Sequence, residues 1–83
     1  MEINNLVGMA NRIGDFFESM PDRTEAKAGI AQHLSKFWEP RMRETLMAHI
    51  HEETTAALHK LVREAILENL DMLATKRVGV HSG

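Results

Sequence analysis

Histidine is the residue type in this sequence with the most obvious capacity for metal chemistry, and a single residue separates His49 from His51. On a helix, residues two positions apart project to nearly opposite sides, so this pair would not converge on one ion. His33 and His49 fall on predicted apolar faces and could meet in a core. Because zinc sites need three or four convergent ligands, we expect each ring instead to donate an N–H to a carbonyl and to pack like a small aromatic. We therefore predict no metal site.

The residues that usually carry catalysis are scarce. Cysteine is absent, which removes both a thiolate nucleophile and thiolate metal ligands. The serines Ser19, Ser35 and Ser82 fall on predicted polar faces or near the C-terminus, and the five glycines are scattered singly, so there is no glycine-rich phosphate loop. Carboxylates such as Glu64 and Glu68 lie on predicted solvated faces, where they support ion pairs with neighbouring bases. We expect no catalytic and no cofactor-binding residues in this chain.

The chain has 83 residues, which is short for a domain, and its net charge is −2. We expect residues 1–74 to form a single helical domain and residues 75–83, which lack a continued apolar stripe, to form a flexible and disordered tail. A chain of this length buries only roughly 60% of the surface that its unfolded form exposes. Because disulfides are excluded, the remaining source of extra stability is a protein partner.

Charge and hydropathy exclude other classes of partner. The basic groups Arg41/Arg43 and Lys76/Arg77 are too short for a nucleic-acid-binding face, so we expect no nucleic acid. No apolar run approaches the roughly 20 residues that span a bilayer, so we expect no membrane. The N-terminus also lacks a basic segment followed by a hydrophobic stretch, which argues against a signal peptide. With no cysteine to oxidise, these features predict a cytoplasmic protein.

The spacing of apolar residues predicts an all-α fold, a small bundle of three to four helices, because no segment alternates apolar and polar residues as a strand would. We expect helices over residues 4–19, 23–38 and 40–53 and from 54 or 55 to 74. Pro21 ends the first, and Asp22 can cap the second with Glu25 completing a capping box. Pro40 suits the first turn of the third.

The boundary between the third and fourth helices stays open. Thr54 or Thr55 can cap the fourth helix through a side-chain hydroxyl. No glycine or proline separates the two helices, however, so one continuous helix is the alternative. On the fourth helix the predicted core face includes Met72 and Leu73, whereas Leu67 and Leu70 point away from it.

The first helix has an unusually wide apolar face, near half of the cylinder, whereas a core-facing stripe need be only about 100° wide. Its flank carries Met9, Phe16 and Met20, more apolar surface than one neighbouring helix can cover. In each of the pairs Phe16-Phe17 and Phe37-Trp38, adjacent residues differ by 100° around the axis, so one of the pair can leave the core.

The corner after the second helix combines an indole with two guanidinium groups. Trp38 is followed by Glu39 and Pro40 and then by Arg41 and Arg43. Tryptophan and arginine are enriched at interface hot spots, which favours a docking role. Packing into the core for Trp38 and a solvated face for the arginines are the alternatives, and the sequence leaves both open.

Three segments and a fourth element resemble the delta subunit of soluble NAD-dependent formate dehydrogenases. They are MANRIGDFF at 9–17, GIAQHL at 29–34, FWEPRMR at 37–43 and LVREA at 61–65. The family carries MAN-x-I-x-x-FF, GIA-x-H and FW-x-PRMR in this order and spacing, with LVREA nearer its C-terminus. The resemblance covers about residues 6–73. The charged stretch 49–59 departs from it by lacking the family's linker glycine, and the last nine residues match nothing in it.

The resemblance implies a non-catalytic accessory subunit of a cytoplasmic, hetero-oligomeric formate dehydrogenase complex. In that family the alpha subunit oxidises formate at a molybdenum bis-pterin centre, while iron–sulfur clusters and FMN in other subunits carry electrons to NAD. The delta subunit would hold none of these cofactors and would bind and stabilise the large alpha subunit. An assembly chaperone of that enzyme and a free-standing helical homodimer are the alternatives. The predicted partner interface consists of Met9, Asn11, Phe16, Met20, Trp38, Arg41 and Arg43.

Overall fold

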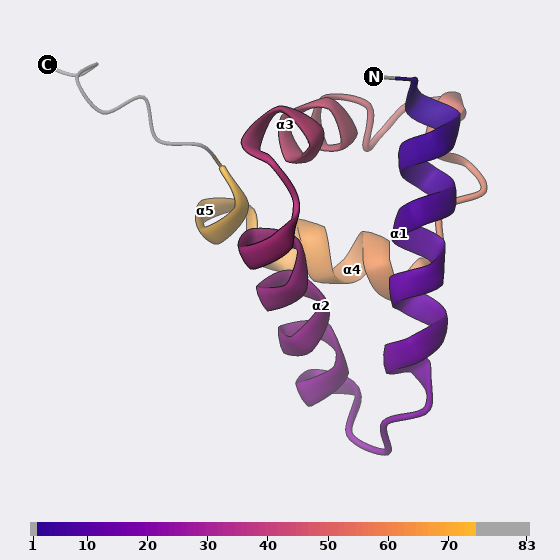
Figure 1. Ribbon diagram of the computed structural model, residues 1–83. Coiled ribbons are helices and arrows are strands. Elements are labelled where there is room, and N and C mark those ends of the chain that lie inside the picture. The colour runs from indigo at the N-terminus through magenta and orange to yellow at the C-terminus, as the bar shows by residue number, and fades with distance from the viewer. Residues whose placement is uncertain (1, 75–83) are drawn as a thin grey trace, which may run out of the picture.

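A computed structural model describes residues 2–74 and contains only helices in that range (Figure 1). The elements are α1 (Ile3–Glu18), α2 (Arg23–Phe37), α3 (Pro40–Ala48), the 3-10 turn η1 (Glu53–Thr55), α4 (Lys60–Glu68) and the single turn α5 (Leu70–Leu73). The prediction of a small all-α bundle is confirmed. The predicted tail, residues 75–83, lies outside the described residues.

The first two helices form an antiparallel hairpin, and local signals set its turn (Figure 1). Pro21 follows α1, and the Oδ1 atom of Asp22 accepts from the backbone N–H of Thr24 at 2.8 Å and of Glu25 at 3.2 Å. The predicted N-cap is therefore confirmed. The reciprocal bond from Glu25 does not form within the described chain, so the capping box is one-sided.

The second corner also follows the sequence. Glu39 is extended, with φ −67° and ψ 150°, and Pro40 occupies the first turn of α3, where its missing N–H leaves no intrahelical bond unmade. Trp38 is likewise extended and closes α2 through its backbone N–H to the Leu34 carbonyl. The predicted break between the second and third helices is confirmed.

The predictions for the third and fourth helices are wrong in their boundaries. The third helix ends at Ala48 rather than near residue 53, and the fourth begins at Lys60 rather than at residue 54 or 55, so one continuous helix is also excluded. Thr55 does not cap α4. Its buried hydroxyl donates instead to the carbonyls of His49 at 2.8 Å and Glu52 at 3.0 Å.

Side-chain donors hold the segment that follows α3. The Arg63 guanidinium, on α4, donates to the carbonyls of Ile50 and Thr55. Of the carbonyls that Thr55 and Arg63 contact, that of Ile50 receives no backbone N–H from residues 2–74, and Arg63 supplies its donor. The carbonyls of His49, Glu52 and Thr55 accept a side-chain bond in addition to a backbone N–H. The cap of α4 is His59, whose Nδ1 accepts from the N–H of Leu61 at 3.1 Å.

The predicted fourth helix is also interrupted near its end. Asn69, with φ −132° and ψ 35°, separates α4 from α5, and its side-chain amide donates to the Ala65 carbonyl at 2.8 Å. After this break Leu73 is buried, whereas Met72 is 46% exposed, so placing Met72 on the core face was wrong. Leu67 and Leu70 are exposed as predicted.

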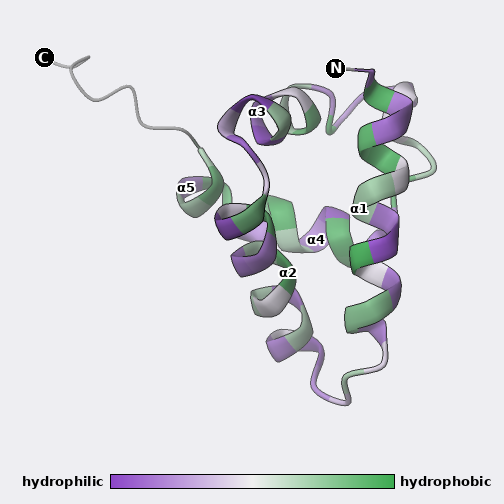
Figure 2. Cartoon of the chain, in the orientation of Figure 1, coloured by the Kyte–Doolittle hydropathy of each residue, from purple (hydrophilic) through white to green (hydrophobic). Residues whose placement is uncertain are grey.

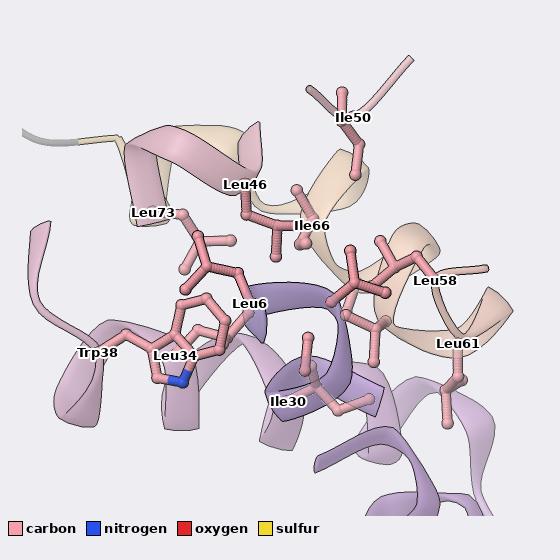
Figure 3. Close-up of a cluster of buried hydrophobic side chains, with 14 of the residues drawn as sticks. Leu6, Ile30, Leu34, Trp38, Leu46, Ile50, Leu58, Leu61, Ile66 and Leu73 are labelled. Atoms are coloured by element: carbon pink, nitrogen blue, oxygen red, sulfur yellow. The ribbon is translucent and has the colours of Figure 1, made fainter. Parts of the chain in front are cut away.

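One core joins all the helices (Figure 3). The wide apolar face of α1 contacts α2, α3, η1 and α4, so its coverage takes several neighbours, as its width indicated. In Figure 3 the Trp38 indole lies beside Leu34 and Leu6. The buried apolar residues that form this core cluster are Leu6, Val7, Ala10, Ala26, Ile30, Leu34, Trp38, Met42, Leu46, Ile50, Leu58, Leu61, Val62, Ala65, Ile66 and Leu73.

Two glycines, Gly14 on α1 and Gly29 on α2, allow neighbouring side chains to approach the helix backbone closely. A Cβ atom on Gly14 would lie 2.8 Å from side-chain atoms of both His59 and Val62, and one on Gly29 would lie 2.5 Å from the ring of Phe17. Side chains at these two positions would force their neighbours to move. The rings of His59 and Phe17 therefore sit where they do because α1 and α2 lack side chains there.

Ion pairs tie α2 to α4 at the surface. Arg23 contacts Glu64 at 2.8 Å, and Lys27 contacts Glu68 at 2.8 Å and Glu64 at 3.7 Å. The hydrogen bond from Arg23, with added attraction from Lys27, lowers the pKa of Glu64 below its ordinary value of 4.5. The two glutamates thus pair with bases on another helix rather than along their own.

Candidate partner-docking surface

The predicted interface residues fall into an outward group and an inward group. Met9, 41% exposed, and Phe16, 73% exposed, lie on the outer side of α1, and Arg41 is exposed on α3. Trp38 is only 6% exposed and Met20 is half-buried against the core. Asn11 and Arg43 are half-buried and engaged in internal hydrogen bonds, described below. The interface role of these seven residues stays a prediction.

A row of aromatic rings connects α1 to α2. The rings of Phe16 and Phe17 meet edge to face, with centroids 5.1 Å apart. Phe17 lies 6.5 Å from His33, and His33 lies 4.8 Å from Phe37, which is 71% exposed. One aromatic of each adjacent pair therefore leaves the core, as the 100° step predicted: Phe16 in the first pair and Phe37 in the second.

Two shallow grooves extend this row along α1. One, of about 310 Å³, is lined by Arg12, Ile13, Phe16, Phe17 and His33. The other, of about 340 Å³, is lined by Asn4, Asn5, Gly8, Met9 and Arg12. Arg12 belongs to both grooves and so lies between them. Figure 2 shows hydrophobic segments recurring along α1. We call the following residues the aromatic face: Met9, Arg12, Ile13, Phe16, Phe17, His33 and Phe37.

Arg12 carries the formal positive charge among the residues of the aromatic face. Its side chain is exposed and makes no hydrogen bond or ion pair with residues 2–74. The residues lining the two grooves include no aspartate or glutamate. A cation placed among apolar groups and left without an internal partner is suited to an external anion. Arg12 was not predicted at the interface, because its spacing in the sequence does not distinguish it from an ordinary solvated arginine.

Arg43 acts inside the chain. Its Nη1 donates to the carbonyls of Trp38 at 2.7 Å and Ser35 at 3.2 Å, and its Nε donates to the Leu73 carbonyl at 3.1 Å. These carbonyls belong to the end of α2, the following residue and the end of α5, where backbone acceptors lack intrahelical donors. One guanidinium therefore joins α2, α3 and α5. The corner after α2 projects Arg41 outward but turns Trp38 and Arg43 inward.

Asn11 also makes internal contacts. Its side-chain oxygen accepts from the His59 N–H at 2.6 Å, and its side-chain nitrogen donates to the Ala57 carbonyl at 3.0 Å. These two bonds attach the middle of α1 to the segment that precedes α4. Asn11 thus has a structural role that its position in the sequence did not reveal.

His59, Asp15 and Glu18 form the group that most resembles a metal site in the described part of the chain. The Nε2 atom of His59 lies 3.2 Å from Glu18 Oε1 and 3.6 Å from Asp15 Oδ1. Its Nδ1 already accepts the helix-capping N–H of Leu61, which places the single proton of the neutral ring on Nε2. In this tautomer Nε2 faces the two carboxylates as a donor, and a metal ion at Nε2 would have to displace that proton. Only the i,i+3 spacing of the two acids is visible in the sequence.

The other histidines behave differently from one another. His33 packs between Phe17 and Phe37 like a small aromatic, as predicted, but its ring makes no hydrogen bond to a carbonyl within residues 2–74. The Nδ1 atom of His49 lies 2.8 Å from the Thr45 carbonyl, which fits the predicted donation to a carbonyl. The two rings do not meet in the core, because His49 is at the end of α3 and His33 faces α1.

Comparison with known proteins matches the chain to one family. The model of the NADH-dependent formate dehydrogenase delta subunit FdsD matches residues 5–66, which is most of the chain and includes the aromatic face. No curated protein and no solved structure matches it. No helix within residues 2–74 combines the length and the apolar content needed to cross a membrane. The family match extends over α1, α2, α3 and most of α4, and the chain therefore belongs to the formate dehydrogenase delta subunit family.

Proposed function

We propose that this chain is a non-catalytic delta subunit of a cytoplasmic NAD-dependent formate dehydrogenase, where it binds and stabilises the large molybdopterin-containing alpha subunit. Membership of the delta subunit family supports the assignment to a multi-subunit enzyme. The observation that carries the proposal is the aromatic face, whose Phe16 and Phe37 are each more than two-thirds exposed. Clustered large apolar side chains on a small protein mark interaction surfaces.

The energetic reason for docking follows from these exposures. Full burial of a phenylalanine side chain contributes roughly 1.5–3 kcal/mol, so covering Phe16 and Phe37 would each contribute a large part of that amount. A free chain of this size has a small core, and a partner that covers the aromatic face would stabilise it by mass action. Docking and stability are thus expected to be coupled.

The redox groups of the enzyme are assigned to the other subunits. Iron–sulfur clusters are held by cysteine thiolates, and this chain has no cysteine. In this proposal the molybdenum bis-pterin, the iron–sulfur clusters, FMN and the NAD site belong to other subunits. The isolated chain is then expected to give no formate-dependent reduction of NAD, and activity of the rigorously purified chain would overturn its assignment as non-catalytic.

Co-purification tests the proposal. An affinity-tagged copy of the chain is expressed with the other subunits, and the active enzyme is isolated by size-exclusion chromatography. We expect the chain in stoichiometric amount in the active fraction. Recovery only with cofactor-free alpha subunit would show a transient assembly chaperone, and recovery only as a dimer of itself would show a free-standing homodimer.

A further inference from the structure

We propose that the aromatic face receives an amphipathic helix of a partner subunit, which lays an apolar stripe across Phe16 and Phe37 and directs a carboxylate at Arg12. This inference rests on the proposed function and adds to it the surface used and the chemistry of the segment that binds there.

Charge complementarity identifies the acidic component. Arg12 lies between two grooves whose linings contain no carboxylate, and it has no ion-pair partner within residues 2–74. When an apolar segment covers the face, the guanidinium loses part of its hydration. Such a group requires a charged hydrogen-bonding partner, and a carboxylate can accept two parallel N–H bonds from it.

The same charge argues against a second copy of this chain as the occupant. In a two-fold symmetric interface, the residue near the centre of the patch faces its own copy. Arg12, shared by both grooves, would then oppose Arg12 without an intervening anion. Residues 75–83 of the chain do not supply a side-chain carboxylate either, because they contain Lys76 and Arg77 but no aspartate or glutamate.

The surroundings of the face favour a helical occupant. Residues 2–74 include no strand, so they offer no sheet edge to which an extended peptide could add. The face is built from two antiparallel helices, and the stripe Met9, Ile13 and Phe16 follows the three- and four-residue spacing of α1. Helices pack by placing ridges of this spacing into the grooves of a partner helix, so an amphipathic helix fits this surface.

The first test measures binding of single variants to the dehydrogenase complex prepared without this chain. Arg12→Glu is compared with Arg41→Glu, since both side chains are exposed and make no hydrogen bond or ion pair within residues 2–74. We expect Arg12→Glu to weaken binding by roughly 30-fold or more, the scale of a hot-spot arginine, and to weaken it at least about tenfold more than Arg41→Glu at the rival corner after α2. Circular dichroism of both variants verifies that the helices remain.

A second test identifies the occupant. The photoreactive residue p-benzoylphenylalanine replaces Phe16 in the assembled complex, with Leu70 as the matched exposed control position on α5. We expect the Phe16 position to crosslink to another subunit, in a segment where an aspartate or glutamate lies within one helical turn of an apolar stripe. Crosslinking to a second copy of this chain, or to a segment without a carboxylate, would overturn the inference.

The outcomes separate this inference from the proposed function. If the wild-type chain joins the complex and Arg12→Glu joins it equally well, the docking surface lies elsewhere while the subunit assignment stands. If Arg41→Glu alone abolishes binding, the corner after α2 is the docking site. If the wild-type chain does not bind the complex at all, the proposed function fails and the inference fails with it.

Discussion

Replacing Arg43 by methionine tests whether this residue holds the fold together or serves a partner. The substitution keeps an unbranched apolar side chain but removes every N–H donor of the guanidinium. The Leu34 carbonyl, which keeps the Trp38 N–H, loses only a 3.5 Å contact. Three other backbone carbonyls, at Ser35, Trp38 and Leu73, lose their donor. They lie at helix ends, where no backbone N–H of the same helix can replace it.

The size of the effect follows from these three bonds. Hydrogen bonds contribute about 1 kcal/mol each on average, so Arg43→Met is expected to lower the free energy of unfolding by about 3 kcal/mol. A chain of 83 residues is stable by only about 4–12 kcal/mol at typical values per residue. The loss is therefore a large part of the total, and with a urea slope of about 1 kcal/mol per molar the midpoint falls by roughly 3 M.

The assay is urea unfolding followed by two probes, circular dichroism at the helical band and fluorescence of Trp38, the sole tryptophan. Trp38 is buried beside the altered residue, so its emission reports the local environment, and coincidence of the two curves establishes two-state unfolding. Arg41→Met is the matched control, and its midpoint is expected to change by less than about 0.5 M because surface substitutions cost within about 0.5 kcal/mol. Equal midpoints for the two variants would refute the assignment of Arg43 as an internal clamp. Wild-type stability of Arg43→Met together with failure to join the complex would instead establish the docking role.

Three further predictions concern stability. Gly8→Ala is expected to raise the free energy of unfolding by up to about 1 kcal/mol, because a Cβ there meets nothing within 4 Å and alanine favours helix. Gly14→Ala should lower the free energy of unfolding by about 1–3 kcal/mol, because its Cβ would collide with side chains near the start of α4. The urea midpoints of the two variants test both expectations. Asn11→Ala, which removes two hydrogen bonds to the segment before α4, should cost about 1–3 kcal/mol, and a wild-type thermal midpoint would contradict that. The hydrogen bond from Arg23 lowers the pKa of Glu64, so the unfolded state binds the proton more readily than the folded state. The contribution of this pair to stability is therefore present above pH 4.5 and is lost as the pH falls through the lowered pKa. Glu64→Gln should therefore show a flatter acid dependence of its urea midpoint than wild type, and identical acid profiles would exclude the linkage.

Local physics in the sequence determined where the second and third helices begin and where the first two end. Pro21 cannot continue a regular helix easily, Asp22 supplies an acceptor for exposed N–H groups, and Pro40 requires an extended residue before it. These effects act within four residues, and each appears in the structure as predicted. The same local geometry showed that one aromatic of each adjacent pair can leave the core.

Resemblance of short motifs identified the family, yet it did not distinguish residues that build the fold from residues that face outward. Trp38, Asn11 and Arg43 belong to the resembling segments and were predicted at the interface. In the structure the indole is buried, and the two polar side chains satisfy backbone groups elsewhere in the chain. A motif records residue identity and order, and it carries no information on direction.

Only the tertiary structure decided the features that depend on contacts between distant residues. Asn11 reaches a backbone 48 positions away, and Arg43 reaches one 30 positions away. Arg63, on α4, donates to the Ile50 carbonyl just beyond α3, which receives no backbone N–H within the described chain. The sequence by itself determined the helical class, the wide face of α1 and the first two breaks, because those follow from the bonding and spacing of near neighbours. Packing of the helices determines which polar groups find internal partners and which remain for an external one. It therefore decided where the third helix ends, that Trp38 and Arg43 point inward at the corner after α2, and that Arg12 stays without a partner on an apolar face.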